Sequence, residues 1–214
     1  MAASICIESA ERLAELETEN LFLVRGGRPV QQKLGCRAAA GEILAITGRN
    51  GAGKTSLLRA LAGFLEPQEG EIRFRLASGK VVTGGDERGL FVGWVGHHDG
   101  IKPQLTPAEH LNFCLAYAQR EGDIAAALSE IGLGPLRDLP SQYLSAGQRR
   151  RLAFARLTLA GRPLWLLDEP FSALDAQGKL FVRTLMERHC AEGGIVIAAT
   201  HEPLGLPGAA LELC

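Results

Sequence analysis

The chain has 214 residues, of which 46% are hydrophobic and 22% charged, and its formal net charge is −1. These values are ordinary for one globular domain and exclude a disordered or fibrous protein. A net charge near zero offers no basic face for nucleic acid, so no nucleic-acid partner is expected. The sequence contains no run of about 20 apolar residues that could span a bilayer, and the first 20 residues lack the apolar core of a secretory signal.

The cysteines lie far apart in the sequence, at Cys6, Cys36, Cys114, Cys190 and Cys214. Their number is odd and no Cys-x-x-Cys occurs. This pattern favours reduced thiols in a cytosolic compartment over a disulfide framework or a zinc site.

The first third of the chain predicts an antiparallel β layer. Two strands, Leu13–Val24 and Val30–Arg37, flank an Arg-Gly-Gly-Arg-Pro turn. A second hairpin is expected at Glu71–Leu76 and Lys80–Val82, with Ser-Gly at its turn.

Three short apolar runs are typical of buried parallel strands: Ile43–Thr47, Leu164–Leu167 and Ile195–Thr200. They are followed by a glycine loop, an acidic pair and a histidine, respectively. Ligands of open α/β sheets bind at the carboxyl ends of the strands, so we expect these three features to be neighbours in space.

The pattern becomes helical between residues 105 and 160. Thr106 to Glu109 combine a capping box with proline at the first helical position, which predicts a helix to about Arg120. Asp123 caps a second helix that ends near Gly132, and Ser145 to Gln148 form another capping box before a helix that reaches Ala160. We therefore predict one α/β domain over residues 1–214. Its core, with the β layer, comprises 13–104 and 146–214, and a helical subdomain comprises 105–145.

A phosphate loop carries the strongest chemical signal. Residues 48–55, Gly-Arg-Asn-Gly-Ala-Gly-Lys-Thr, match G-x-x-x-x-G-K-[ST] between a predicted strand and a predicted helix, Lys54–Ala62. In such a loop backbone N–H groups surround the phosphates, the lysine neutralises the β- and γ-phosphates, and the threonine hydroxyl binds Mg²⁺. The predicted ATP-binding residues are Gly48, Asn50, Gly51, Gly53, Lys54, Thr55 and Ser56.

An acidic pair, Asp168 and Glu169, ends the second parallel strand. Beside a phosphate loop, the first acid is placed to hold Mg²⁺ and the second to polarise the attacking water. A solvated acidic pair at a turn is the alternative. His201 similarly ends the third strand, where a lone histidine is more often structural than catalytic.

Residues 144–148, Leu-Ser-Ala-Gly-Gln, resemble the signature motif of ATP-binding cassette (ABC) ATPases, which in that family shortly precedes the acidic strand. The resemblance spans about Leu13 to His201. It implies a P-loop NTPase fold and ATP hydrolysis with Mg²⁺ held by Thr55 and Asp168. It also implies a homodimer in which Ser145, Gly147 and Gln148 complete the ATP site of the other subunit. By the same resemblance, Glu169 is the general base, His201 is the switch histidine, and Asp175 belongs to the loop that senses the partner's site. A capped helix start explains Asp175 equally well.

A narrower resemblance is carried by residues 94–102, Trp-Val-Gly-His-His-Asp-Gly-Ile-Lys, and by 111–113, Leu-Asn-Phe. This pattern is similar to the ATP-binding subunits of cytochrome c maturation haem exporters (CcmA-type). It implies small integral membrane subunits as partners, haem handling or export as the driven process, and a peripheral position on the cytoplasmic face of the bacterial inner membrane. A partner groove is expected near residues 97–113.

Two positions depart from the family pattern. His98 stands where ABC proteins normally have a glutamine that touches Mg²⁺ or the attacking water. It is either a catalytic substitute for that glutamine or a neutral surface residue. The turn at residues 25–28 lacks an aromatic residue for adenine stacking, which leaves loose base recognition or a stacked arginine.

Three alternatives remain at this stage: the ATPase of another small-substrate ABC transporter, a soluble ABC protein acting on nucleic acid or ribosomes, and a nucleotide-regulated module without turnover. The absence of a long coiled-coil insertion or a second cassette disfavours the soluble protein. The carboxylate at Glu169 argues against a module without turnover.

Overall fold

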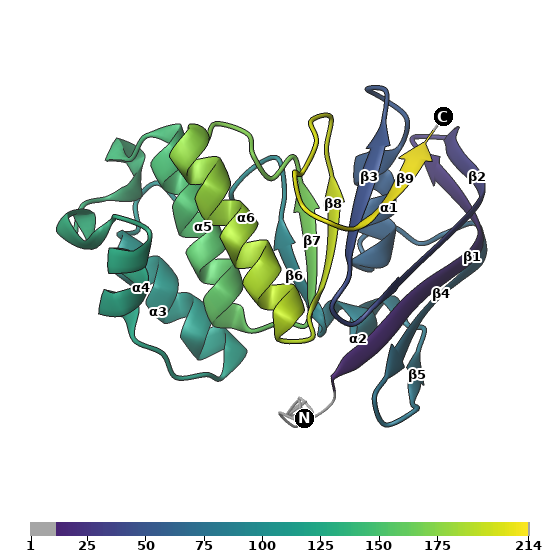
Figure 1. The fold of residues 1–214 in the computed structure, drawn as a ribbon, viewed down its shortest axis with the longest axis horizontal. Helices are drawn as coiled ribbons and strands as arrows, with labels where there is room; N and C mark the ends of the chain where they lie inside the picture. The colour runs from purple at the N-terminus through teal and green to yellow at the C-terminus, as the bar shows by residue number, and fades with distance from the viewer. Residues whose placement is uncertain (1–11, 214) are drawn as a thin grey trace.

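The computed structural model describes residues 12–213, except for the side chain of Arg28, and its fold is built around two sheets (Figure 1). The parallel sheet has the strand order β6-β7-β8-β3-β9. Its strands are β3 Ile43–Gly48, β6 Val92–Val95, β7 Leu164–Asp168, β8 Ile195–Ala199 and β9 Ala209–Leu213. The antiparallel sheet has the order β2-β1-β4-β5. Its strands are β1 Leu13–Arg25, β2 Arg28–Ala39, β4 Glu69–Leu76 and β5 Val81–Val82.

The helices divide between the two faces of the parallel sheet. Helix α1, Lys54–Leu61, packs against strands of both sheets. Helices α5, Ala146–Ala160, and α6, Ala176–Ala191, cover the opposite face (Figure 1). Helices α3, Pro107–Ala118, and α4, Ile124–Glu130, pack beside α5, and two 3₁₀ turns follow at Gly134–Leu136 and Ser141–Tyr143. A short helix α2, Gly85–Gly89, precedes β6.

Three apolar clusters hold these layers together. The first joins α1 to both sheets, the second joins α5 and α6 to the parallel sheet, and the third lies among the helices of residues 105–145 and α5. Strands β7 and β8 are buried along their whole length because helices cover both faces of the sheet. This packing positions the carboxyl ends of β3, β7 and β8 side by side.

The predicted strands, hairpins and capping boxes are confirmed, with ends that shift by a few residues. Helix α3 ends at Ala118 and not at Arg120, because Gln119 adopts a left-handed conformation with φ 52°. Helix α2, strands β6 and β9 and the full length of α6 were not predicted from the sequence. Strand β6 is only four residues long and contains Gly93, and β9 is an edge strand with mostly exposed residues.

Within residues 12–213 no helix is both long and apolar enough to cross a membrane. Over the same residues Cys36, Cys114 and Cys190 are free thiols. Burial raises the pKa of Cys190 to about 11, so this thiol stays protonated at neutral pH. Cys6 and Cys214 lie outside the described residues.

Candidate functional site

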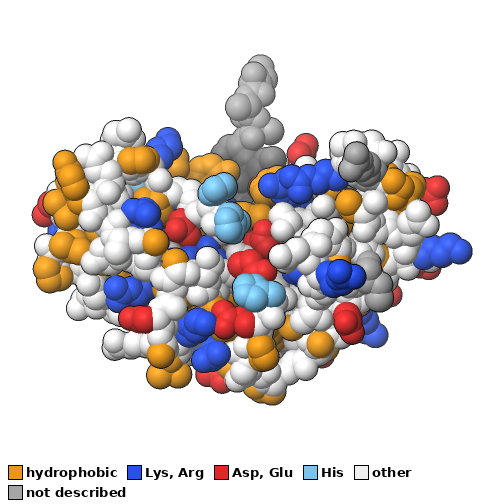
Figure 2. Space-filling view, turned by 90° about the horizontal axis from the view of Figure 1, so that it is seen from above, with side chains coloured by type: hydrophobic (Ala, Val, Ile, Leu, Met, Phe, Trp, Pro, Cys, Tyr) orange, Lys and Arg blue, Asp and Glu red, His pale blue; other side chains and the backbone are white. Residues whose placement is uncertain are grey.

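A cavity of about 350 Å³ opens at the carboxyl ends of the parallel strands. In the view from above, histidine and acidic side chains gather in the middle of this face (Figure 2). The lining combines the loop between β3 and α1, residues Asn50–Ser56, with Arg25 at the end of β1, Val30 in β2, His97 after β6, Asp168 at the end of β7 and Glu169 after it. The structure therefore brings the phosphate loop and the acidic pair together, as the strand order required.

Glycines shape the phosphate loop. Gly48 has φ 135°, and a Cβ there would lie 2.3 Å from the carbonyl oxygen of Leu213 on the neighbouring strand β9, so a larger residue does not fit. Gly53 has φ 93° and precedes the first turn of α1. The buried Lys54 reaches back across the loop, and its Nζ donates to the carbonyl oxygens of Gly48 at 2.7 Å and Arg49 at 3.3 Å. An ammonium held at the loop in this way can exchange these carbonyls for phosphate oxygens.

Thr55 and Asp168 meet at the floor of the cavity although 113 positions separate them. The Thr55 hydroxyl donates to Oδ2 of Asp168 at 2.9 Å, and Asp168 is buried. A hydroxyl and a carboxylate oxygen form the hard-oxygen donor set that suits Mg²⁺. The two predicted metal ligands are thus adjacent and fit that ion.

Glu169 and His201 form the second polar pair of the site. The Nδ1 of His201 lies 2.7 Å from Oε2 of Glu169, and an ionised carboxylate only accepts, so the imidazole donates from Nδ1. Glu169 has φ 51°, a left-handed conformation that costs a non-glycine residue about 1–2 kcal/mol. Its N–H donates to Ala199 of β8 at 2.8 Å. Strain of this kind persists where the surroundings hold a side chain in one orientation.

The predicted signature residues lie at the start of α5, away from this cavity. Ser145 and Gln148 form a capping box, in which Ser145 Oγ accepts from the Gln148 N–H at 3.2 Å. A Cβ on Gly147 would lie 3.0 Å from the carbonyl oxygen of Ala173, so the signature abuts the loop that leads to Asp175. Asp175 caps α6 through a bond from the Gly178 N–H at 2.7 Å. Within residues 12–213 none of these four residues lines the phosphate-loop cavity of its own chain.

Two residues of the cavity wall, His97 and Arg25, were not among the predicted site residues. His97 lines the phosphate-loop cavity, whereas His98 does not, and the ring of His98 meets that of His97 edge-on with centroids 5.4 Å apart. The role predicted for His98 stays a prediction, and His97 joins it as a candidate. Both histidines follow β6, a strand that was not predicted. The sequence therefore could not show how far each histidine lies from the end of that strand. Arg25 also lines the cavity, at the turn where an arginine was one option for stacking on adenine.

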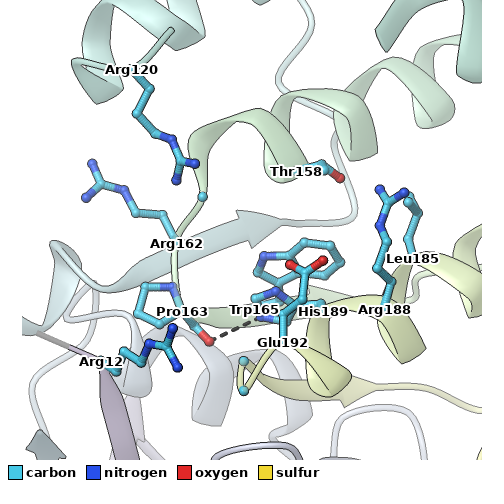
Figure 3. Close-up of a pocket in the computed structure, with 13 residues that line it drawn as sticks. Arg12, Arg120, Thr158, Arg162, Pro163, Trp165, Leu185, Arg188, His189 and Glu192 are labelled. Carbon is cyan, nitrogen blue, oxygen red and sulfur yellow. Dashed lines mark hydrogen bonds between the residues drawn. The ribbon is translucent and has the colours of Figure 1, made fainter. Parts of the chain in front are cut away.

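A second cavity, of about 240 Å³, lies at the opposite, amino-terminal edge of the parallel sheet (Figure 3). Its floor holds Trp165 and His189, whose rings stack with centroids 3.9 Å apart and an angle of 9°. The charged residues that line this cavity are Arg12, Arg120, Arg162, Arg188 and Glu192. Arg162 and Arg188 already bond to Leu90 and Glu130. Burial lowers the pKa of His189 to about 4, so the ring is neutral at physiological pH.

This shifted pKa predicts a stability that falls in mild acid. The unfolded chain protonates His189 near pH 6.5, but the folded chain resists protonation down to about pH 4. The free energy of unfolding therefore decreases as pH falls through this window, by about 3 kcal/mol at most from this group. The variant His189→Phe keeps an aromatic ring stacked on Trp165 but cannot be protonated. Urea titrations from pH 7 to pH 4 should therefore show a smaller decrease in its free energy of unfolding than in that of the wild type. An unchanged pH dependence in the variant would assign the acid sensitivity to other groups.

A phosphate loop, an oxygen pair for Mg²⁺ and a carboxylate–histidine pair on this sheet define the class of the protein, a P-loop ATPase. The model of the protein family described as "ABC transporter" matches residues 32–172 of the chain. The chain is 49% identical over 192 residues to "Cytochrome c biogenesis ATP-binding export protein CcmA" of Rhodopseudomonas palustris (strain BisB5), covering 89% of this chain and 94% of that protein. It is 43% identical to the protein of the same name from Rhizobium johnstonii, covering 92% of this chain and 89% of that one.

Solved structures agree in fold. An ATP-binding subunit of an ABC transporter has a TM-score of 0.75 at 23% identity, covering 87% of this chain and 79% of that chain. A bacterial Atm1-family ABC exporter with ATP bound has a TM-score of 0.80 at 22% identity, covering 94% of this chain and 37% of that chain. The chain belongs to the ABC transporter family, as an ATPase, and within it to the CcmA-type ATP-binding proteins.

Proposed function

We propose that this ATPase drives a membrane complex of cytochrome c biogenesis, handling or exporting haem, from the cytoplasmic face of the bacterial inner membrane. The observation that carries the proposal is the 43–49% identity to CcmA proteins over about nine tenths of the chain. The phosphate-loop cavity supplies the chemistry, because it holds a lysine, a metal-ligand pair and a general-base candidate in one place.

In the proposed reaction, the loop amides and Lys54 hold the β- and γ-phosphates of ATP, and Arg25, which lines the same cavity, stacks on the base. Thr55 and Asp168 would hold Mg²⁺, which would neutralise charge on these phosphates. Glu169 accepts a proton from the attacking water. His201 donates from Nδ1 to that carboxylate and holds it in place.

The proposed functional unit is a head-to-tail homodimer. Ser145, Gly147 and Gln148 present the amino terminus of α5, a 15-residue helix whose positive dipole end suits an anion. Since they do not line the cavity of their own chain, the phosphate that they serve belongs to the ATP of a second copy. Each copy then completes the site of the other.

The proposed docking site for small integral membrane subunits is the groove between α3, α5 and β6, which we call the α3–β6 groove. It encloses about 180 Å³ and is lined by residues that include Trp94, Asp99, Phe113, Tyr117 and Leu157. The side chains of Phe113 and Tyr117 are stacked and are 66% and 77% exposed. Exposed aromatic residues beside a groove are typical of protein interfaces. We take residues 105–145, which contribute α3, as the helical subdomain.

We expect Phe113→Asp to remove most of the membrane subunits that co-purify with the chain, by about tenfold or more, because an interfacial aromatic anchor often contributes 2 kcal/mol or more. The same variant should abolish maturation of c-type cytochromes, read on haem-stained gels, in a bacterium whose own CcmA-type gene is deleted. Leu180→Asp is the matched control, since Leu180 is 62% exposed on α6 and does not line this groove. Undiminished recovery of membrane subunits and cytochromes with Phe113→Asp would refute the docking site.

A further inference from the structure

Arg150 is a fully buried cation. It lies in α5, two residues after Gln148, and its side chain is 2% exposed. Removing a guanidinium from water costs several kcal/mol unless its donors are satisfied. Here every arm of the guanidinium has a partner, and all but one of the partners are backbone carbonyl oxygens.

One side of the guanidinium holds the turn after β7. Nη2 donates to the carbonyl oxygens of Asp168 at 3.0 Å and Glu169 at 2.7 Å, and Nε donates to that of Pro170 at 3.3 Å. Glu169 is the residue with φ 51°. Arg150 therefore binds the backbone of the strained residue whose side chain is the general-base candidate.

The other side holds the loop after β6. Nη1 donates to the carbonyl oxygen of Gly96 at 2.7 Å and to Oδ1 of Asp99 at 2.9 Å. Between these two residues His97 lines the phosphate-loop cavity, and Asp99 itself lines the α3–β6 groove. One planar guanidinium thus bridges the groove, the loop that carries His97 and the backbone of Glu169.

We propose that Arg150 is a positioning residue that holds the carboxylate of Glu169 in its reactive place and couples that place to Asp99 at the groove. A lysine keeps the charge, but its single ammonium cannot span both loops. The inference rests on the proposed role of Glu169 as the general base. Helix α5 then has a second role besides presenting the signature residues: through Arg150 it links the α3–β6 groove to Glu169 within one chain.

The test compares turnover with ATP affinity in the full-length chain purified from detergent-solubilised membranes. Arg150→Lys should lower kcat about 10- to 100-fold, because small misplacements of a reacting group have effects of this size. Its Kd for a fluorescent ATP analogue should stay within about twofold of the wild type. Arg151→Lys is the matched control, since Arg151 is the next residue of α5 and makes no hydrogen bond to either loop within residues 12–213. An equal loss of kcat and ATP affinity in Arg150→Lys would mean a structural role and overturn the inference.

A double-mutant cycle tests the coupling itself. Asp99→Asn leaves Arg150 in place and should lower kcat about 3- to 10-fold, and the double variant should be no slower than Arg150→Lys alone, because both changes break one chain of contacts. If the losses of kcat in the two single variants multiply in the double variant, the two residues act independently and the coupling is overturned.

In the Glu169→Gln background, Arg150→Lys should still form the ATP-trapped dimer, since Arg150 acts on the base and not on the dimer contact. Loss of that dimer would assign Arg150 to the signature instead. The proposed reaction fails by a different measurement. Normal turnover in Glu169→Gln would show that Glu169 is not the general base, whatever kcat the Arg150 variants have.

Discussion

Replacing Glu169 by glutamine is expected to leave ATP binding intact and to reduce steady-state hydrolysis by at least about 100-fold, the usual contribution of a general base. Glutamine keeps the size of the side chain and can still pair with His201, but its amide cannot take a proton from water. Because the phosphate loop is untouched, the variant should accumulate as a dimer with ATP trapped inside. Phosphate release and size-exclusion chromatography with ATP measure the two effects.

Glu202→Gln is the matched control for this experiment. Glu202 follows β8 at the same edge of the sheet, but it pairs with Lys179 at 2.6 Å and does not line the phosphate-loop cavity. Its turnover should remain close to that of the wild type. Near-normal hydrolysis by Glu169→Gln would assign the base to another residue.

Combining two inactive chains should restore activity if the ATP sites are shared between subunits. Lys54→Ala removes the phosphate-loop cation, and Ser145→Arg blocks the amino terminus of α5, so each variant alone should hydrolyse ATP at about 1% of the wild-type rate or less. In a heterodimer of the two, one site has both lesions and the other has none. When the chains carry different tags and are purified through both, hydrolysis should recover to at most about half the wild-type rate, given a symmetric pair of sites.

The control combines Lys54→Ala with Thr55→Ala. Both lesions then lie in the phosphate loop, so each site of the heterodimer keeps one damaged loop and no recovery is expected. Heterodimers of Lys54→Ala and Ser145→Arg that remain as inactive as the separate variants would refute the head-to-tail arrangement.

Elements that depend only on residues close together in the sequence were predicted correctly. The capping boxes at Thr106 and Ser145, the glycine loop and the buried runs of β7 and β8 were readable because caps, turns and short apolar runs depend on neighbours in sequence. Strand β6 was not readable, because its four residues include a glycine and gain their stability from pairing with β7. With β6 hidden, His97 could not be distinguished from His98 as the residue that lines the cavity.

By itself the sequence determined that this chain has a phosphate loop between a strand and a helix, an acidic strand end and a signature-like helix start. These features are short, and each carries its own chemical constraint. Only the tertiary structure decided which of them meet. The strand order β6-β7-β8-β3-β9 brings Thr55 into contact with Asp168, and the packing of the strand ends brings His201 to Glu169. The buried guanidinium of Arg150 connects two loops that are far apart in the chain. Long-range pairing and burial decide such contacts, because they depend on the whole sheet and its helices.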